Sequence, residues 1–154
     1  MNVFYNFLFV ALPYAALAVF LIGSVYRYTA TGFKFSSLSS QFLEGRKLFW
    51  GSVPFHWGIM VVFLGHITAF MFPKTTLLWN SHPVRLIILE VTAFVFGLSL
   101  FFGLLNLFIR RITHPRLKPV TNNMDIVIEV LLLLQVVLGL WIALGFRWGS
   151  SWFA

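Results

Sequence analysis

Four long apolar segments constrain the fold of this chain more than any other feature. A helix needs roughly 20 residues to cross a hydrocarbon core of about 30 Å, and each segment is that long. None alternates polar and apolar residues as membrane barrel strands do, so only helices can satisfy the backbone in lipid. We therefore expect an all-α integral membrane helical bundle, with residues 1–154 as a single membrane domain. The four expected transmembrane helices cover residues 4–26, 53–72, 84–109 and 124–146.

The charged residues predict how the chain is oriented. The net charge is +7, but the basic residues lie at segment ends and form no interleaved basic face, so we expect no nucleic-acid partner. They gather in the connection between the first and second segments and in the connection between the third and fourth. The positive-inside rule places both connections in the cytoplasm and the amino terminus outside. The chain is thus expected to be a multi-pass protein of the cytoplasmic (inner) membrane.

Several residues suggest where the helices begin and end. Ser52 suits the N-cap of the second helix, with Pro54 in its first turn, where the missing N–H breaks no helical hydrogen bond. Pro73 is expected to close that helix. Asp125 and Glu129 fall in the first turns of the last helix, where the helix dipole favours carboxylates.

Two histidines interrupt the second segment. His56 and His66 lie in the stretch 54–70, which is otherwise apolar. An ionisable group at membrane depth is costly and usually serves a cofactor, an ion path or a buried partner. Their separation of ten residues corresponds to about 15 Å along a helix and roughly 80° around it, so one metal centre cannot bind both. We interpret them as axial ligands of two haem groups at different depths, each haem taking its second imidazole from another helix.

The neighbours of the histidines allow two interpretations. Gly58 and Gly65 lack side chains that would block a flat macrocycle, and aromatic residues nearby offer packing surfaces. Alternatively, each histidine forms a hydrogen bond with a neighbouring helix and the glycines tighten helix packing. Their position along the helix assigns His56 to an inner haem and His66 to an outer one.

The chain resembles a known family, the gamma subunit of membrane-bound respiratory nitrate reductase, which is a quinol-oxidising cytochrome b. The resemblance runs through nearly the whole chain in order. Its motifs are Pro13-Tyr14, Arg27-Tyr28, Ser39-Ser40-Gln41-Phe42-Leu43, Phe55-His56, Gly65-His66, His114-Pro115-Arg116, Thr121 with Asp125-Ile126, and Gln135 with Leu138-Gly139-Leu140.

The resemblance implies a function and a set of partners. Quinol or menaquinol would be oxidised near the outer face, and electrons would pass through two haem b groups to a cytoplasmic iron–sulfur subunit. A molybdenum-containing catalytic subunit would then reduce nitrate. The sequence contains no cysteine, so the iron–sulfur clusters would belong to the partner. The family also implies five helices, the last carrying the two opposing haem ligands, so we expect this chain to be truncated or completed by another polypeptide.

His82 and His114 do not fill that role, because both lie in loops beside prolines at opposite faces of the membrane. In this family quinol oxidation is associated with the outer haem. A quinol site is therefore expected beside Gly65 and His66, with Arg85 donating to a quinol oxygen and Glu90 accepting a proton. For Arg85, a purely interfacial arginine is an equal alternative.

Three arginines, Arg46, Arg110 and Arg111, are candidates for holding haem propionates, although setting the topology is their simpler role. Three other functions also fit the sequence. One is a gamma-type cytochrome b that serves a different quinone-linked oxidoreductase. A second is a haem-free membrane anchor with structural histidines, and a third is a proton-coupled transporter that uses Glu90 and the histidines.

Overall fold

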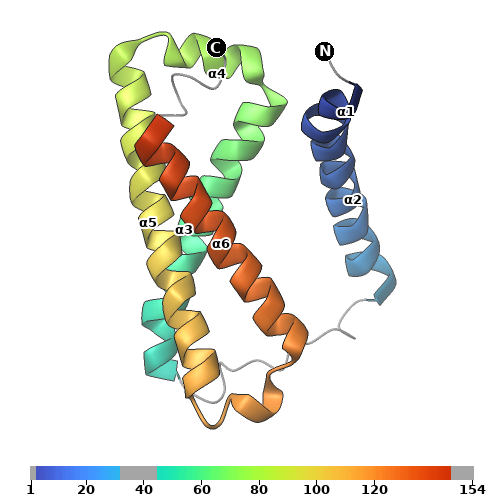
Figure 1. Cartoon of the computed structure of the whole chain (residues 1–154), viewed down its shortest axis with the longest axis vertical. Helices are drawn as coiled ribbons and strands as arrows, with labels where there is room; N and C mark the ends of the chain where they lie inside the picture. Colours follow the sequence, from blue (N-terminus) through green and yellow to red (C-terminus); the bar gives the residue numbers. More distant parts are fainter. Residues whose placement is uncertain (1–2, 32–44, 147–154) are drawn as a thin grey trace. The chain divides into compact units, whose positions relative to one another are not determined.

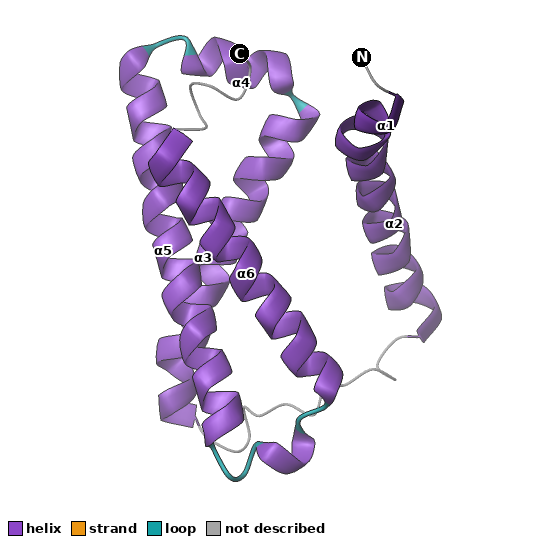
Figure 2. Cartoon of the chain, viewed as in Figure 1, coloured by secondary structure: helices purple, strands orange, loops and turns teal. Residues whose placement is uncertain are grey.

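The computed structural model describes residues 3–31 and 45–146, and within these ranges every regular element is a helix (Figure 1, Figure 2). The chain forms two compact units, Met1–Ser39 and Ser40–Ala154. Four helical stretches are long and apolar enough to cross a membrane: Val3–Ala30, Leu48–Met71, Pro83–Thr113 and Asn123–Gly145. The prediction of an all-α fold with four spanning helices is confirmed.

The first unit is one helical path with two wider turns. Its elements are α1 (Val3–Asn6), the π-helical η1 (Phe7–Ala11), α2 (Leu12–Tyr26) and the π-helical η2 (Arg27–Thr31). The first wide turn, η1, ends at Ala11, two residues before Pro13, whose nitrogen has no hydrogen to donate. At this turn the Leu12 N–H donates a hydrogen bond to the Phe7 carbonyl, five residues earlier. The helical path continues beyond the predicted end at residue 26.

The second unit contains three long helices. Its elements are α3 (Gly45–Met71), α4 (Pro73–Asn80), α5 (Pro83–Thr113), the short 3-10 helix η5 (Lys118–Val120) and α6 (Asn123–Phe146). The short α4 joins α3 to α5 at one end of the unit (Figure 1). From the other end α6 returns along α5, so α5 is packed against both of the other long helices.

The second spanning helix differs from the prediction at its start. The chain is already helical at Gly45, so Ser52 lies inside α3 and the prediction that it is the N-cap is wrong. Pro54 also lies inside α3 rather than in its first turn. Its missing N–H removes one helical hydrogen bond, but the helix continues through it. Ser99 of α5 donates a hydrogen bond of 3.1 Å to the Pro54 carbonyl. At its other end α3 stops at Met71, as expected before Pro73.

Glycines bring the backbones of α3 and α5 into direct contact. A Cβ on Gly58 would lie 2.5 Å from the Leu100 backbone nitrogen. A Cβ on Gly103 would collide with the Phe55 backbone nitrogen and lie 2.9 Å from the Gly51 carbonyl oxygen. Only residues without side chains permit this approach, and membrane helices commonly pack through such residues. The crossing therefore fixes the part of α3 that carries His56.

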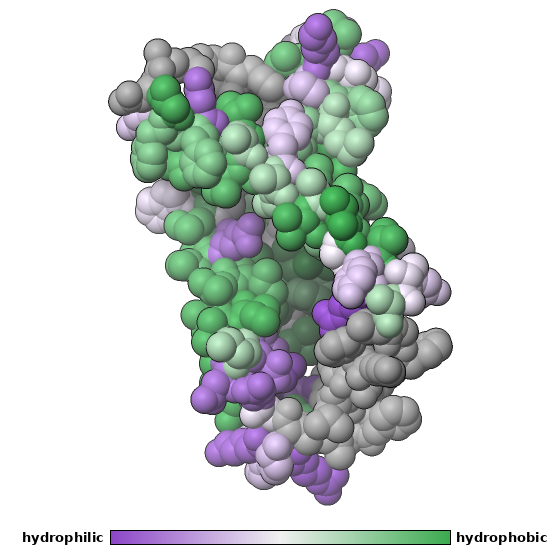
Figure 3. Space-filling model, turned by 90° about the vertical axis from the view of Figure 1, so that its right-hand side faces the viewer, coloured by the Kyte–Doolittle hydropathy of each residue, from purple (hydrophilic) through white to green (hydrophobic). Residues whose placement is uncertain are grey.

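Most apolar side chains of the described residues point outward. Ala69, Leu100, Leu104 and Leu117 form the buried hydrophobic core among them, whereas Trp141 of α6 is 71% exposed. Hydrophobic residues cover much of the described surface in Figure 3. A surface of this kind is stable against lipid rather than water, because transferring apolar area out of water is favourable.

Candidate functional site

His56 and His66 lie on the same helix, and both are exposed on its surface. Each is hydrogen-bonded to the backbone of its own helix. His56 Nδ1 is 2.7 Å from the Ser52 carbonyl oxygen, and His66 Nδ1 is 2.7 Å from the Val62 carbonyl oxygen. Because a carbonyl oxygen only accepts hydrogen bonds, the hydrogen of each neutral imidazole is on Nδ1. Each Nε2 therefore carries the lone pair that a metal ligand needs.

His56 has two further neighbours. The Ser52 hydroxyl oxygen is 3.2 Å from His56 Nδ1. The Phe55 ring lies edge-on to the imidazole, with ring centroids 5.2 Å apart and an interplanar angle of 88°. A histidine held through Nδ1 in this way is oriented for binding a metal through its other nitrogen.

The two glycines near the histidines differ in their surroundings. Gly58 faces the Leu100 backbone, so the space that its missing side chain leaves is filled by α5 rather than open to a cofactor. Helix packing explains this glycine. In contrast, a Cβ on Gly65 would meet no atom within 4 Å among the described residues. The surface next to His66 is therefore open to a flat ligand.

Arg85 and Glu90 lie on the first turns of α5, toward the same end of the unit as the His66 half of α3 (Figure 1). The Arg85 guanidinium carbon is 5.1 Å from the centroid of the Trp79 ring in α4, which is a cation–π geometry. The arrangement agrees with an interfacial position of Arg85. Glu90 lies about 7.5 Å further along the helix axis and is half-buried.

The other two histidines stand far apart. His82 precedes α5 and His114 follows it. Since α5 has 31 residues, its ends are about 45 Å apart. Among the described residues no group of three or more His, Cys, Asp or Glu side chains is placed to bind a metal ion. One axial imidazole per haem needs no such group.

Sequence reasoning missed one cluster, which joins α5 to α6. Arg111 Nε is 2.7 Å from Glu129 Oε1, and Arg111 Nη1 is 3.3 Å from Asp125 Oδ2. The same carboxylate accepts a 3.1 Å hydrogen bond from the Asn122 N–H just before α6. Arg111 is thus held by two carboxylates, which is a simpler role than binding a propionate. A basic helix end followed by an acidic helix start was the sequence signal.

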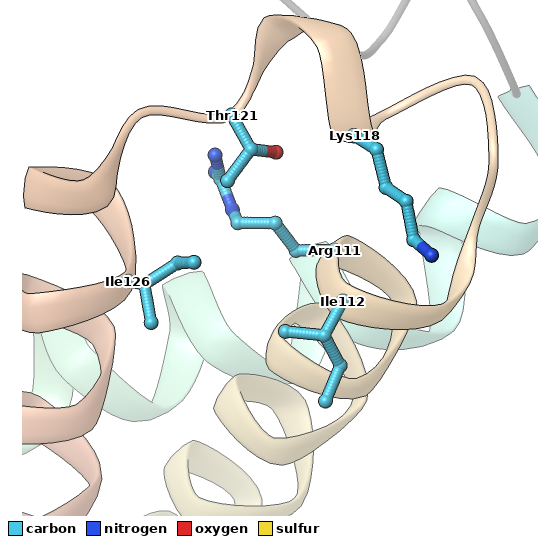
Figure 4. Close-up of a pocket in the computed structure, with 5 residues that line it drawn as sticks. All are labelled: Arg111, Ile112, Lys118, Thr121 and Ile126. Carbon is cyan, nitrogen blue, oxygen red and sulfur yellow. The ribbon is translucent and has the colours of Figure 1, made fainter.

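A small cavity lies beside this cluster (Figure 4). It measures about 240 Å³ and is lined by Arg111, Ile112, Lys118, Thr121 and Ile126. The Arg111 side chain extends toward Thr121, whose hydroxyl donates to the Leu117 carbonyl at 2.7 Å. The cavity is part of the connection between α5 and α6, and neither His56 nor His66 lines it.

The fold and the two histidines place this chain in a general class of protein. It is a helical membrane protein with several spans, one of which carries two histidines. Comparison with known proteins identifies the family. Residues 5–153 match the family model described as "Nitrate reductase gamma subunit". This chain belongs to the nitrate reductase gamma subunit family, as its motifs indicated.

Three individual proteins that are similar to this chain are each named a nitrate reductase gamma chain. The chain is 34% identical over 135 residues to the respiratory nitrate reductase 1 gamma chain of Escherichia coli (strain K12), covering 87% of this chain and 60% of that protein. It is 32% identical over 142 residues to the respiratory nitrate reductase 2 gamma chain of the same organism, covering 91% and 61%. The nitrate reductase gamma chain of Bacillus subtilis (strain 168) is 30% identical over 131 residues, covering 83% and 58%. This chain therefore spans about three fifths of the length of these relatives.

Proposed function

We propose that this chain is the membrane electron-transfer subunit of a respiratory nitrate reductase complex and that it holds two b-type haems, one on His56 and one on His66. The observation that carries the proposal is the matched setting of these imidazoles. Both lie on one membrane-spanning helix, and both direct Nδ1–H to a carbonyl four residues earlier. That hydrogen bond fixes the tautomer and the ring orientation that axial ligation requires.

When bound, haem supplies one-electron transfer, and the histidines set where that transfer takes place. A separation of about 15 Å along α3 places the two ligands at different depths. We expect the opposing ligands from a helix other than those described, because His82 and His114 stand at opposite ends of α5. The haem that His56 binds would lie near the α3–α5 crossing, and the haem that His66 binds would lie nearer to α4.

The basic residues support an orientation. Arg110 and Arg111 end α5 at one face, and the short α4 lies at the other. By the positive-inside rule the basic face is cytoplasmic, in the cytoplasmic membrane. Quinol would then be oxidised at the outer face, beside Gly65 and His66. Arg85 would bind a quinol oxygen and Glu90 would accept a proton, while electrons pass inward to an iron–sulfur subunit and the molybdenum catalytic subunit.

Quinol-dependent haem reduction tests this function. The complex that contains this chain is purified from membranes, and its oxidised and reduced absorption spectra are recorded before and after addition of a quinol. We expect quinol alone to produce the absorption spectrum of reduced b-type haem. Added nitrate should then return the haem to its oxidised spectrum. A spectrum without b-type haem would instead identify a haem-free anchor. Haem that quinol reduces but nitrate does not reoxidise would point to a different terminal reductase.

A further inference from the structure

We propose that Ser52 is a positioning residue for His56 and that its hydroxyl lowers the midpoint potential of the haem that His56 binds. The inference rests on the proposed function and adds to it an asymmetry between the two haem sites. The two sites differ in the side chain that lies four residues before each histidine. Ser52 precedes His56, and Val62 precedes His66.

The hydrogen bonds at His56 give the hydroxyl a defined role. The Ser52 carbonyl, 2.7 Å from His56 Nδ1, already requires the imidazole hydrogen to be on that nitrogen. The Ser52 hydroxyl oxygen, 3.2 Å from the same nitrogen, can therefore interact with Nδ1 only as a second acceptor. His56 Nδ1–H is thus shared between two oxygens of one residue.

A second acceptor changes the electronics of the ligand. Hydrogen bonding from Nδ1–H raises the basicity of a metal-bound imidazole. A more basic ligand favours ferric over ferrous iron, and hydrogen bonding around the axial ligand is one of the ways by which a protein sets a haem potential. The haem on His56 should therefore be harder to reduce than it would be without the Ser52 hydroxyl.

The surrounding helix packing holds Ser52 in place. On one side, a Cβ on Gly51 would lie 2.9 Å from Leu107 Cδ2, so this turn of α3 is pressed against α5. On the other side, the Pro54 carbonyl accepts the hydrogen bond from Ser99. Ser52 itself is half-buried. Ser52 and His56 lie one turn apart on α3, so the distance between the hydroxyl and the imidazole is set within this helix and does not depend on the hydrogen bond from Ser99.

Redox titration of the purified haem-containing complex tests the role of Ser52. Absorbance is followed while the potential is lowered, and the His56-dependent signal is assigned from its loss in His56→Ala. In Ser52→Ala we expect about a threefold rise in the ratio of reduced to oxidised haem at a fixed potential, which is about 28 mV for a one-electron couple. The haem on His66 should keep its potential in the same sample.

Matched variants separate the hydroxyl from other effects of the substitution. Ser52→Thr keeps a hydroxyl, so we expect a potential near the wild-type value, whereas Ser52→Val replaces that hydroxyl with a methyl group and should raise the potential. Ser99→Ala removes a hydroxyl from the same crossing without touching the imidazole and should leave both potentials unchanged.

Two sets of results overturn different claims. An unchanged or lowered His56-dependent potential in Ser52→Ala and Ser52→Val, or an equal shift of both haems, refutes the role of Ser52 while leaving haem binding intact. The absence of b-type haem, or retention of both haems in His56→Ala, refutes the proposed function itself.

Discussion

Replacing Gly103 with alanine should push α3 and α5 apart. The new Cβ would lie 2.8 Å from the Phe55 Cα and 2.9 Å from the Gly51 carbonyl oxygen. Carbon atoms in contact prefer a separation of about 3.5–4.0 Å, so the backbones must separate by about 1 Å. Neither atom belongs to a flexible side chain, so the strain cannot be relieved by a rotamer change.

The expected cost follows from that displacement. Overpacking of a well-packed contact costs about 1–3 kcal/mol, whereas alanine in place of glycine favours a helix by about 1 kcal/mol. Gly139 of α6 is a matched control, because a Cβ there would meet no atom within 4 Å among the described residues. The helix-propensity gain is common to both variants, so Gly103→Ala should be about 1–3 kcal/mol less stable than Gly139→Ala.

Unfolding of the purified protein in detergent micelles, followed by far-ultraviolet circular dichroism, measures this difference. Gly58→Ala repeats the test at the Leu100 backbone and should behave like Gly103→Ala. Equal stabilities of Gly103→Ala, Gly58→Ala and Gly139→Ala would refute the direct backbone contact between α3 and α5.

Three further substitutions test the polar residues. Arg111→Ala leaves the Glu129 carboxylate, 14% exposed, without its cation and should destabilise the protein by about 3 kcal/mol in the same unfolding assay, whereas Arg116→Ala in the exposed connection should change stability by less than about 0.5 kcal/mol. Glu90→Gln should slow quinol-dependent haem reduction by about 10²-fold, and an unchanged rate across pH would rule out its proposed role. Arg85→Ala should raise the quinol concentration needed for half-maximal reduction, and an unchanged requirement would leave Arg85 a purely interfacial role.

The sequence was sufficient to predict the four membrane-spanning helices, because membrane spans are defined by length and hydrophobicity alone. It misplaced the start of α3, because Pro54 looked like a helix start although a membrane helix tolerates an internal proline. It also missed α4, whose eight residues are too few and too polar to resemble a span. Local patterns thus gave the spans but not every boundary.

The site was predictable only in part, for a physical reason. His56 and His66 stood out because imidazoles are unusual in an apolar run. Contacts between helices depend on the rotation and register of each helix, which no single segment encodes. The ion pairs of Arg111 with Asp125 and Glu129 are of this kind. The packing of Gly58 against Leu100 is another contact of this kind. The sequence suggested that Gly58 makes room for a cofactor, whereas in the structure it makes room for the α5 backbone.

The amount of b-type haem bound per protein in single histidine variants tests the central claim most directly. Pyridine haemochrome assay of the purified complex should give two b-type haems for the wild type and one each for His56→Ala and His66→Ala, with distinct residual spectra in the two variants. Two haems retained in either variant, or no haem in the wild type, would contradict the assignment of one haem to each histidine.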